Sequence, residues 1–218
     1  MRSKREPRTD GEATRSRILE AAGKLFSMTG YAETSGKAIA AEAAVDVASI
    51  NYHFGSRSGL YQAVLFEAHR RLVDLADLQQ LLDSPLAPPA RLARLIERLV
   101  DEALGEPRGW HLHVLAREVM APSSHLHTLI RDAVGPKLAV IKRILSEITG
   151  IPVDDPALLR CLISVGAPCM MLLVGGSHAP GPLHEVFRMP RQAIVDHLVS
   201  FALSGLETIG RDYARRTR

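Results

Sequence analysis

The stretch from residue 34 to residue 57, TSGKAIAAEAAVDVASINYHFGSR, contains two short helical patterns with a break between them, and it decides the fold. Thr34 can cap the first helix, which runs to about Ala43, because a threonine oxygen accepts hydrogen bonds from the free N–H groups of a first turn. Asp46 can cap the second helix in the same way, and Gly55 can end it. Two short helices joined by a tight turn form a helix-turn-helix.

The second of these helices has one apolar side and one side that is small or polar. Ile50 and Phe54 can face inward. The positions around the outward side are Val47, Ala48, Ser49, Asn51 and Tyr52. A helix that enters the DNA major groove needs such a surface, because Ser and Asn bond base edges or phosphates and small apolar side chains contact the thymine methyl group. Short helix pairs in protein cores can show the same pattern, so periodicity alone leaves both interpretations open.

The sequence around this motif predicts further helices and no convincing strand. Only 5% of the residues are aromatic, which argues against an all-β sandwich, and good helix formers such as Leu, Ala, Arg and Glu dominate. Apolar residues at helical spacing predict helices over 12–28, 34–43, 46–54, 56 to about 78, 90–104, 110–120, 125–149 with a kink at 135–136, 158–174 and 194–209. The Gly- and Pro-rich stretch 175–190 is expected to be a loop. The predicted fold class is all-α.

Cysteine usage and hydropathy indicate a reduced, cytoplasmic protein. Two cysteines, Cys161 and Cys169, do not make a disulfide framework and lack a metal-binding spacing, so we expect both to be reduced packing residues. The longest apolar stretch, 161–174, is interrupted and too short for a membrane span, and we interpret it as a buried helix. The basic N-terminus is not followed by the apolar region of a signal peptide.

Charged and histidine residues give weaker signals. The formal net charge is only +3, but bases gather at both ends: Arg2, Lys4, Arg5, Arg8, Arg211, Arg215, Arg216 and Arg218. Whether these ends contact DNA or are solvated tails stays open. The pairs His111 with His113 and His125 with His127 are two positions apart, on different helix faces, unlike the i, i+4 pairs that bind metals. We expect no metal and no cofactor.

Four runs of sequence carry a resemblance to a known family. They are ILxAAxxLF at 18–26, GYxxTS at 30–35, IAxxAxV at 39–45 and INYHFxSRxxLY at 50–61. Together they resemble the TetR family of transcriptional regulators from about Thr14 to Val64. The resemblance implies an N-terminal three-helix DNA-binding domain with a basic arm, residues 1–57, followed by a helical effector-binding and dimerisation domain, residues 58–218.

The resemblance also implies which residues contact DNA. The expected set is Thr34, Ser35, Lys37, Val47, Ala48, Ser49, Asn51, Tyr52, His53 and Arg57. By the resemblance, Ser35 and Lys37 meet the DNA backbone or nearby bases from the first helix of the motif. Bases are read by Val47, Ala48, Ser49 and Asn51, while phosphates are held by Tyr52, His53 and Arg57. For Tyr52 and His53 the alternative is packing against the first helix.

The sequence departs from the family pattern at two positions of the motif. Ala44 stands where the turn usually has Gly, so the turn must avoid a positive φ or accept a small strain. Asn51 stands where a Tyr is common, which can change the base or phosphate that it prefers.

The family places an effector pocket inside the larger domain and a dimer contact on its last two major helices, here 158–174 and 194–209. The candidate effector-binding residues are Trp110, His113, Arg117, Glu118 and Met170. Each has a structural alternative: Trp110 and Met170 can be core filler, and Arg117 and Glu118 can make internal contacts. The pattern names neither the effector nor the operator.

Three functions are compatible with these expectations. The first is a homodimeric repressor that is released from a palindromic operator in double-stranded DNA by a small molecule. The second is an activator, or a DNA-binding regulator without any ligand. The third is a helical enzyme, which lacks support because no nucleophile elbow, carboxylate pair or metal spacing appears. Saturable, salt-dependent binding to one operator separates the first two from the third.

Overall fold

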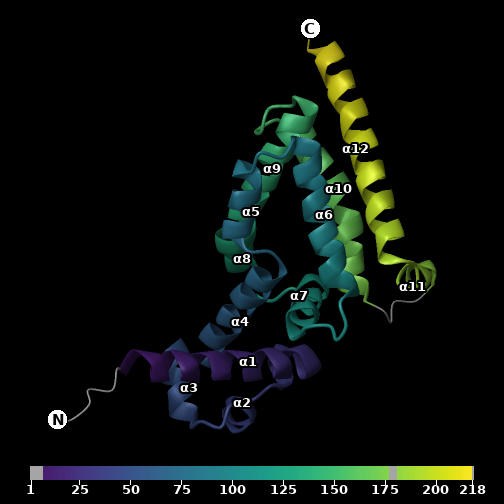
Figure 1. The fold of residues 1–218 in the computed structure, drawn as a ribbon. Helices are drawn as coiled ribbons and strands as arrows, with labels where there is room; N and C mark the ends of the chain where they lie inside the picture. Colours follow the sequence, from purple (N-terminus) through teal and green to yellow (C-terminus); the bar gives the residue numbers. More distant parts are fainter. Residues whose placement is uncertain (1–6, 177–180, 218) are drawn as a thin grey trace, which may run out of the picture.

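The computed structural model describes residues 7–176 and 181–217, and within these ranges the only regular secondary structure is helical. The predicted all-α fold class is therefore confirmed. Figure 1 shows α1, α2 and α3 together at the N-terminal end of the molecule, with α4 running from them towards the remaining helices. The first four helices are α1 (Pro7–Glu33), α2 (Gly36–Glu42), α3 (Val47–Phe54) and α4 (Arg57–Leu72).

The larger part of the molecule contains the other helices. They are α5 (Leu75–Asp83), α6 (Pro88–Leu104), α7 (Trp110–Met120), α8 (Leu126–Leu129), the π-helical turn η1 (Ile130–Val134), α9 (Gly135–Thr149), α10 (Pro156–Gly175), α11 (Pro182–Val186) and α12 (Arg191–Arg216). Helix α12 lies along the outer side of α10 and α6, and the C-terminus is at the end of the molecule opposite the first three helices (Figure 1).

The N-terminal helices pack around a hydrophobic core that is not wholly their own. Ile18, Phe26, Ile39 and Ile50 are buried there, together with one side of α4 formed by Leu60, Tyr61, Val64, Leu65 and Ala68. Three residues of the larger part complete this core: Trp110 and Val114 of α7 and Leu129 of α8. The predicted domain boundary at residue 57 therefore does not coincide with a boundary between two cores.

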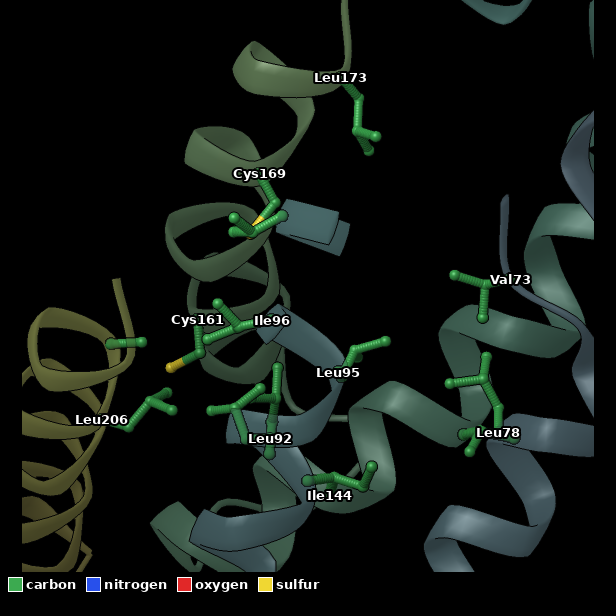
Figure 2. Close-up of a cluster of buried hydrophobic side chains, with 14 of the residues drawn as sticks. Val73, Leu78, Leu92, Leu95, Ile96, Ile144, Cys161, Cys169, Leu173 and Leu206 are labelled. Carbon is green, nitrogen blue, oxygen red and sulfur yellow. The ribbon is translucent and has the colours of Figure 1, made fainter. Parts of the chain in front are cut away.

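The second core lies between α6, α9, α10 and α12. Figure 2 shows Leu92 and Ile96 of α6 beside Cys161 of α10, with Leu206 of α12 on the outer side. Both cysteines are buried and free, as predicted, and burial raises the pKa of the Cys169 thiol to about 11.

Apart from the lengths of individual helices, three predicted elements differ in the structure. The helix that was expected from 56 to about 78 ends at Leu72, because Val73 is extended and Asp74 caps a new helix by accepting from the Ala76 N–H at 2.8 Å. The expected loop 175–190 contains the short helix α11. The expected kink at 135–136 takes the form of the π-helical turn directly before Gly135, one of the recognised ways to bend a helix.

Helices α10 and α12 are longer than the sequence predicts, and each has an exposed apolar side. By length and composition alone each could span a membrane, with mean hydropathy of 2.1 and 1.2, yet only 28% and 22% of these windows are buried inside the chain. The large apolar residues exposed on them are Leu159, Ile163, Met170, Met171, Phe201 and Ile209. In the single chain, the expectation that 161–174 is a buried helix therefore holds for one side of the helix only. One side of these helices packs inward and another lies uncovered.

Candidate nucleic-acid interface

Helix α2 begins one residue later than predicted. Ser35, not Thr34, caps it: the Ser35 hydroxyl accepts from the Ala38 N–H at 3.1 Å. Thr34 is only 3% exposed, and its hydroxyl donates to the Gly30 carbonyl at 2.7 Å. Since this side chain faces the interior, it supports the start of the motif rather than presenting a surface. Ser35 and Lys37, by contrast, are both exposed.

The turn between α2 and α3 accepts strain. Ala44 has φ +51°, the left-handed region in which a Cβ costs about 1–2 kcal/mol. The Val45 N–H donates to the Ala40 carbonyl at 2.9 Å, which closes the end of α2 around this residue. Of the two alternatives for Ala44, strain is therefore the one that the structure adopts.

Local hydrogen bonds fix both ends of α3. The Asp46 carboxylate accepts from the Ser49 N–H and from the Ser49 hydroxyl, each at 2.6 Å. The hydroxyl bond, then the backbone bond, hold the pKa of Asp46 below its usual value. Gly55 ends the helix with φ +74°, and its N–H donates to the Asn51 carbonyl at 2.8 Å. The predicted cap and stop are both confirmed.

The exposed side of α3 is the side that the sequence predicts. Ile50 is 2% exposed, whereas Val47 is 42% and Tyr52 86% exposed. Ala48 and Asn51 are exposed as well. Among the remaining predicted residues, Ser49 is half-buried and bonded to the cap, and the half-buried His53 ring packs edge-on against Tyr52 at 5.0 Å between centroids. This surface can offer an amide, a phenol and small apolar groups to a DNA groove.

Arg57 connects the end of the motif to α1. Its guanidinium donates to the Tyr31 carbonyl at 2.9 Å and to the Thr34 carbonyl at 2.7 Å, and it lies 4.3 Å from the centre of the Tyr31 ring. The half-buried side chain therefore holds the segment before α2 in place. Its predicted phosphate contact stays a prediction.

Comparison with known protein families agrees with this geometry. Residues 18–64 match the family described as bacterial regulatory proteins, tetR family. Residues 88–206, more than half of the chain, match the C-terminal domain of the HTH-type transcriptional dual regulator CecR. This chain belongs to the TetR family of transcriptional regulators.

Individual relatives support the same assignment. The HTH-type transcriptional regulator UidR of Escherichia coli K12 is 36% identical over 63 residues, which are 29% of this chain and only 32% of UidR. A TetR-like transcriptional regulator from Rhodococcus sp. RHA1 superimposes with a TM-score of 0.64 at 23% identity, covering 93% of this chain and 98% of that one. FadR from Bacillus subtilis, solved in complex with stearoyl-CoA, gives 0.65 at 15% identity, covering 87% and 98%. At these identities the solved structures show a common fold.

In this TetR-family chain, the predicted effector residues lie in different surroundings. Trp110 packs in the N-terminal core, and its indole N–H donates to Glu20 at 2.9 Å. Arg117 donates to the Ser27 and Met28 carbonyls at 3.0 and 2.8 Å, at the end of α1. His113 is exposed on α7 and Met170 is 42% exposed on α10.

Glu118, the remaining predicted effector residue, is buried in a hydrogen-bond network. It accepts from the Tyr61 hydroxyl at 2.8 Å and from the Ser123 hydroxyl at 2.7 Å. Burial, followed by this bond to Glu118, raises the pKa of Tyr61 well above its usual value. Internal contacts are thus what the structure shows for Trp110, Arg117 and Glu118, and their role in effector binding stays a prediction.

Sequence reasoning missed the contacts that join α1, α4 and α7. Glu20 accepts from Trp110 with one oxygen and from Arg71 with the other, at 2.8 Å, while the Arg71 guanidinium lies 4.7 Å from the Trp110 ring centre. Ser58 of α4 and His125 are joined by a 2.8 Å hydrogen bond. These partners are far apart in sequence, so no local spacing could have shown them.

Metal binding finds no support in the part of the chain that the structure describes. Within residues 7–176 and 181–217, no three side chains of His, Cys, Asp or Glu are placed together as metal ligands. The basic N-terminal residues Arg2, Lys4 and Arg5, and Arg218 at the other end, lie outside the described residues.

Proposed function

We propose that this TetR-family regulator is a dimeric repressor that holds a palindromic operator with two copies of α3. The observation that supports it best is the division of α3 into a buried side at Ile50 and an exposed side at Val47, Asn51 and Tyr52. A helix held at both ends by local caps and exposed along one side is what major-groove recognition requires. On this proposal, Ser35 and Lys37 add contacts from α2.

The partner in this dimer is a second copy of the chain, bound through α10 and α12. The exposed apolar residues on these helices, among them Ile163 and Phe201 at 60% and 68% exposure, form a surface that is costly to leave in water. A second copy that covers it also explains why two membrane-length helices occur in a protein of the cytoplasm. Two-fold symmetry then places two α3 helices on half-sites about 34–36 Å apart.

Release by a small molecule is the regulatory half of the proposal. FadR from Bacillus subtilis, which shares the fold, was solved with stearoyl-CoA, so the architecture can enclose a ligand. An effector needs to favour the non-binding conformation by only about 1–3 kcal/mol to change operator occupancy substantially. Helix α4 is the direct covalent connection between the motif and the larger part, and it transmits the change.

A second candidate is activation of transcription. The family that matches residues 88–206 takes its description from a dual transcriptional regulator, CecR. This favours activation as a second candidate beside repression. Both candidates require the same operator recognition by α3. They differ in where the operator lies relative to the promoter and in the direction in which transcription changes.

The first experiment is a pull-down of sheared genomic DNA with the purified protein, followed by sequencing of what is retained. The wild type is expected to enrich a short palindrome, with binding that weakens as salt rises. A variant with Asn51→Ala and Tyr52→Ala is expected to lose this enrichment, because each lost base or phosphate contact costs about 1–3 kcal/mol. A variant with Gln79→Ala and Gln80→Ala, on exposed positions of α5, is the matched control and is expected to behave as wild type.

Two outcomes would contradict the proposal. Equal retention of DNA by all three proteins, without sequence preference, would assign the binding to nonspecific electrostatics rather than to α3. Retention of the palindrome that no tested compound releases would contradict the effector half and favour a ligand-independent regulator. Transcription from the flanking genes, measured with and without the protein, distinguishes repression from activation.

A further inference from the structure

A cleft of about 520 Å³ lies where the DNA-binding helices meet the larger part of the molecule. The residues that line it belong to α1, α4, the start of α5, the π-helical turn and the start of α9. Its apolar lining residues are Leu19, Ala63, Phe66, Leu75 and Ala133. This volume is within the range of small-molecule sites, and π-helical turns are frequent at functional sites.

Each acidic side chain that lines the cleft lies within 4 Å of an arginine. Glu67 accepts from Arg70 at 2.8 Å with each oxygen. Asp132 is bonded in the same two-fold way by Arg131, at 2.6 and 2.8 Å. The third acid, Asp74, lies 3.6 Å from Arg70 and caps α5.

Two basic side chains of the lining, Lys137 and Arg15, form no ion pair within 4 Å among the described residues. Lys137 is only 7% exposed, and its ammonium group is within 2.8 Å of both Nδ1 and the carbonyl oxygen of His69. Desolvation, partly offset by the negative charge of Asp74, lowers the pKa of Lys137 to about 8, so a further anion beside this buried cation would be favourable. His69 stays neutral beside it, since burial and then Lys137 lower its pKa to about 4.

Arg15 connects the cleft to α3, the helix that we propose recognises DNA. This exposed side chain of α1 lines the cleft, and its guanidinium also lies 5.0 Å from the centre of the Phe54 ring, in the last turn of α3. An anion in the cleft can therefore attract Arg15 away from the aromatic ring. Such a change at Phe54 would act directly on the helix that we assign to DNA recognition.

We propose that this cleft binds an amphipathic organic acid, whose anionic group pairs with Lys137 and Arg15 and whose apolar part lies against Leu19, Phe66 and Leu75. The ligand contacts both the DNA-binding helices and the larger part, so it can shift one relative to the other. Binding of the acid does not depend on the proposed function; only its effect on the operator rests on that function.

The test uses octanoate as the acid and octan-1-ol as its neutral counterpart, titrated into the full-length protein by isothermal calorimetry. Octanoate is expected to bind once per chain and at least about tenfold more tightly than octan-1-ol, a difference of about 1.4 kcal/mol. Lys137→Met is expected to weaken octanoate at least tenfold, whereas Lys142→Met, on the same helix and outside the cleft lining, leaves it unchanged.

A second pair of variants avoids any dependence on the buried lysine. Arg15→Gln is expected to weaken octanoate severalfold, while Arg17→Gln, another exposed position of α1, has no effect. Equal affinity for the acid and the alcohol, or no binding of octanoate by the wild type, would overturn the proposal. So would unchanged octanoate affinity in both the Lys137 and Arg15 variants, which would place the ligand elsewhere, for example on the exposed apolar side of α10.

Operator binding is measured separately, with and without octanoate. If octanoate binds as expected and no operator is found, the proposed function fails while the cleft assignment stands. If the operator is held and octanoate does not bind, the cleft assignment fails alone.

Discussion

Helices α2 and α3 are short, each begins at a serine or aspartate cap, and the exposed residues of α3 are mostly small or polar. Helices α10 and α12 are long, and large apolar residues remain exposed on them. The first pair is held by bonds between near neighbours in sequence, such as Asp46 with Ser49. The second pair presents an apolar surface that no part of the described chain covers.

This contrast shows two ways of preparing a surface for a partner. A helix that reads DNA must keep its position before the polar partner arrives, so its ends are fixed locally. A helix that joins a second protein chain gains stability from the association itself, because burial of apolar area supplies the free energy. The exposed chemistry of a helix therefore indicates which kind of partner it meets.

The largest effect is expected when the exposed apolar surface of α10 and α12 is disrupted. Ile163→Asp combined with Phe201→Asp should convert the proposed dimer into monomers, since two charges would have to be buried without partners. Operator affinity should fall by at least about a hundredfold as each half-site is then bound singly. Sedimentation velocity measures the first effect and a binding titration the second.

Leu86→Asp is the control for this pair, because Leu86 is also apolar and exposed, at 39%, but lies between α5 and α6. It should leave the dimer intact. A dimer that survives both aspartates would mean that α10 and α12 are not its interface, and the contrast between the two helix pairs would then lose its basis.

The next effect tests how closely α12 packs on its own chain. A Cβ at Gly210 would lie 2.5 Å from the Thr149 carbonyl oxygen and 3.0 Å from the Thr149 Cα, both backbone atoms. Gly210→Ala should therefore destabilise the fold by about 1–3 kcal/mol. Gly11→Ala, inside α1 and with nothing within 4 Å of the added Cβ, should stabilise it by up to about 1 kcal/mol. Urea unfolding at one fixed chain concentration distinguishes the two variants. A change of the same sign in the free energy of unfolding of both would refute the close packing at Gly210.

A smaller effect tests the local caps. The Ser56 hydroxyl accepts from the Gly59 N–H at 3.0 Å at the start of α4. Ser56→Ala should lower the free energy of unfolding by about 1 kcal/mol, and Ser56→Asp, which can also cap, should restore most of it. Thermal unfolding measures both, and an alanine variant as stable as wild type would show that the cap contributes nothing.

The smallest effect concerns the strained turn. Ala44→Gly should raise the free energy of unfolding by about 0.5–1 kcal/mol, because Gly adopts φ +51° without a Cβ clash. Ala41→Gly, at an exposed position inside α2, should lower it by a similar amount. The same substitution at two positions three residues apart should thus have opposite effects on the free energy of unfolding. If the turn were unstrained, urea unfolding would show a loss of stability in both variants.

Much of the motif could be predicted because its signals are local. Asp46, Gly55 and Ser56 each act on residues within four positions, so the start and end of α3 and the start of α4 follow from the sequence. The bounds of α7 were also predicted, since breaking residues flank it. Thr34 was the exception: Ser35 beside it is an equally good cap, and only packing decides that Thr34 is the buried one.

The remaining features depend on residues that are distant in sequence. The break at Val73 interrupts an apolar pattern that continues through it, and no residue there forbids a helix. Residue type alone suggests Glu118 as an effector residue, but its carboxylate accepts a hydrogen bond from Tyr61, which is 57 positions away. The cleft at Lys137 could not be foreseen, because five separate segments of chain line it.

The shared N-terminal core limits how such a protein can be recombined. Gly23 of α1 has no room for a side chain, since a Cβ there would lie 2.5 Å from the Trp110 ring of α7. A chimera that joins residues 1–57 to the larger part of another family member would place Gly23 against whichever residue that protein has in the place of Trp110. A residue with a Cβ at position 23 therefore requires a smaller side chain at position 110, which couples a position in α1 to one in α7.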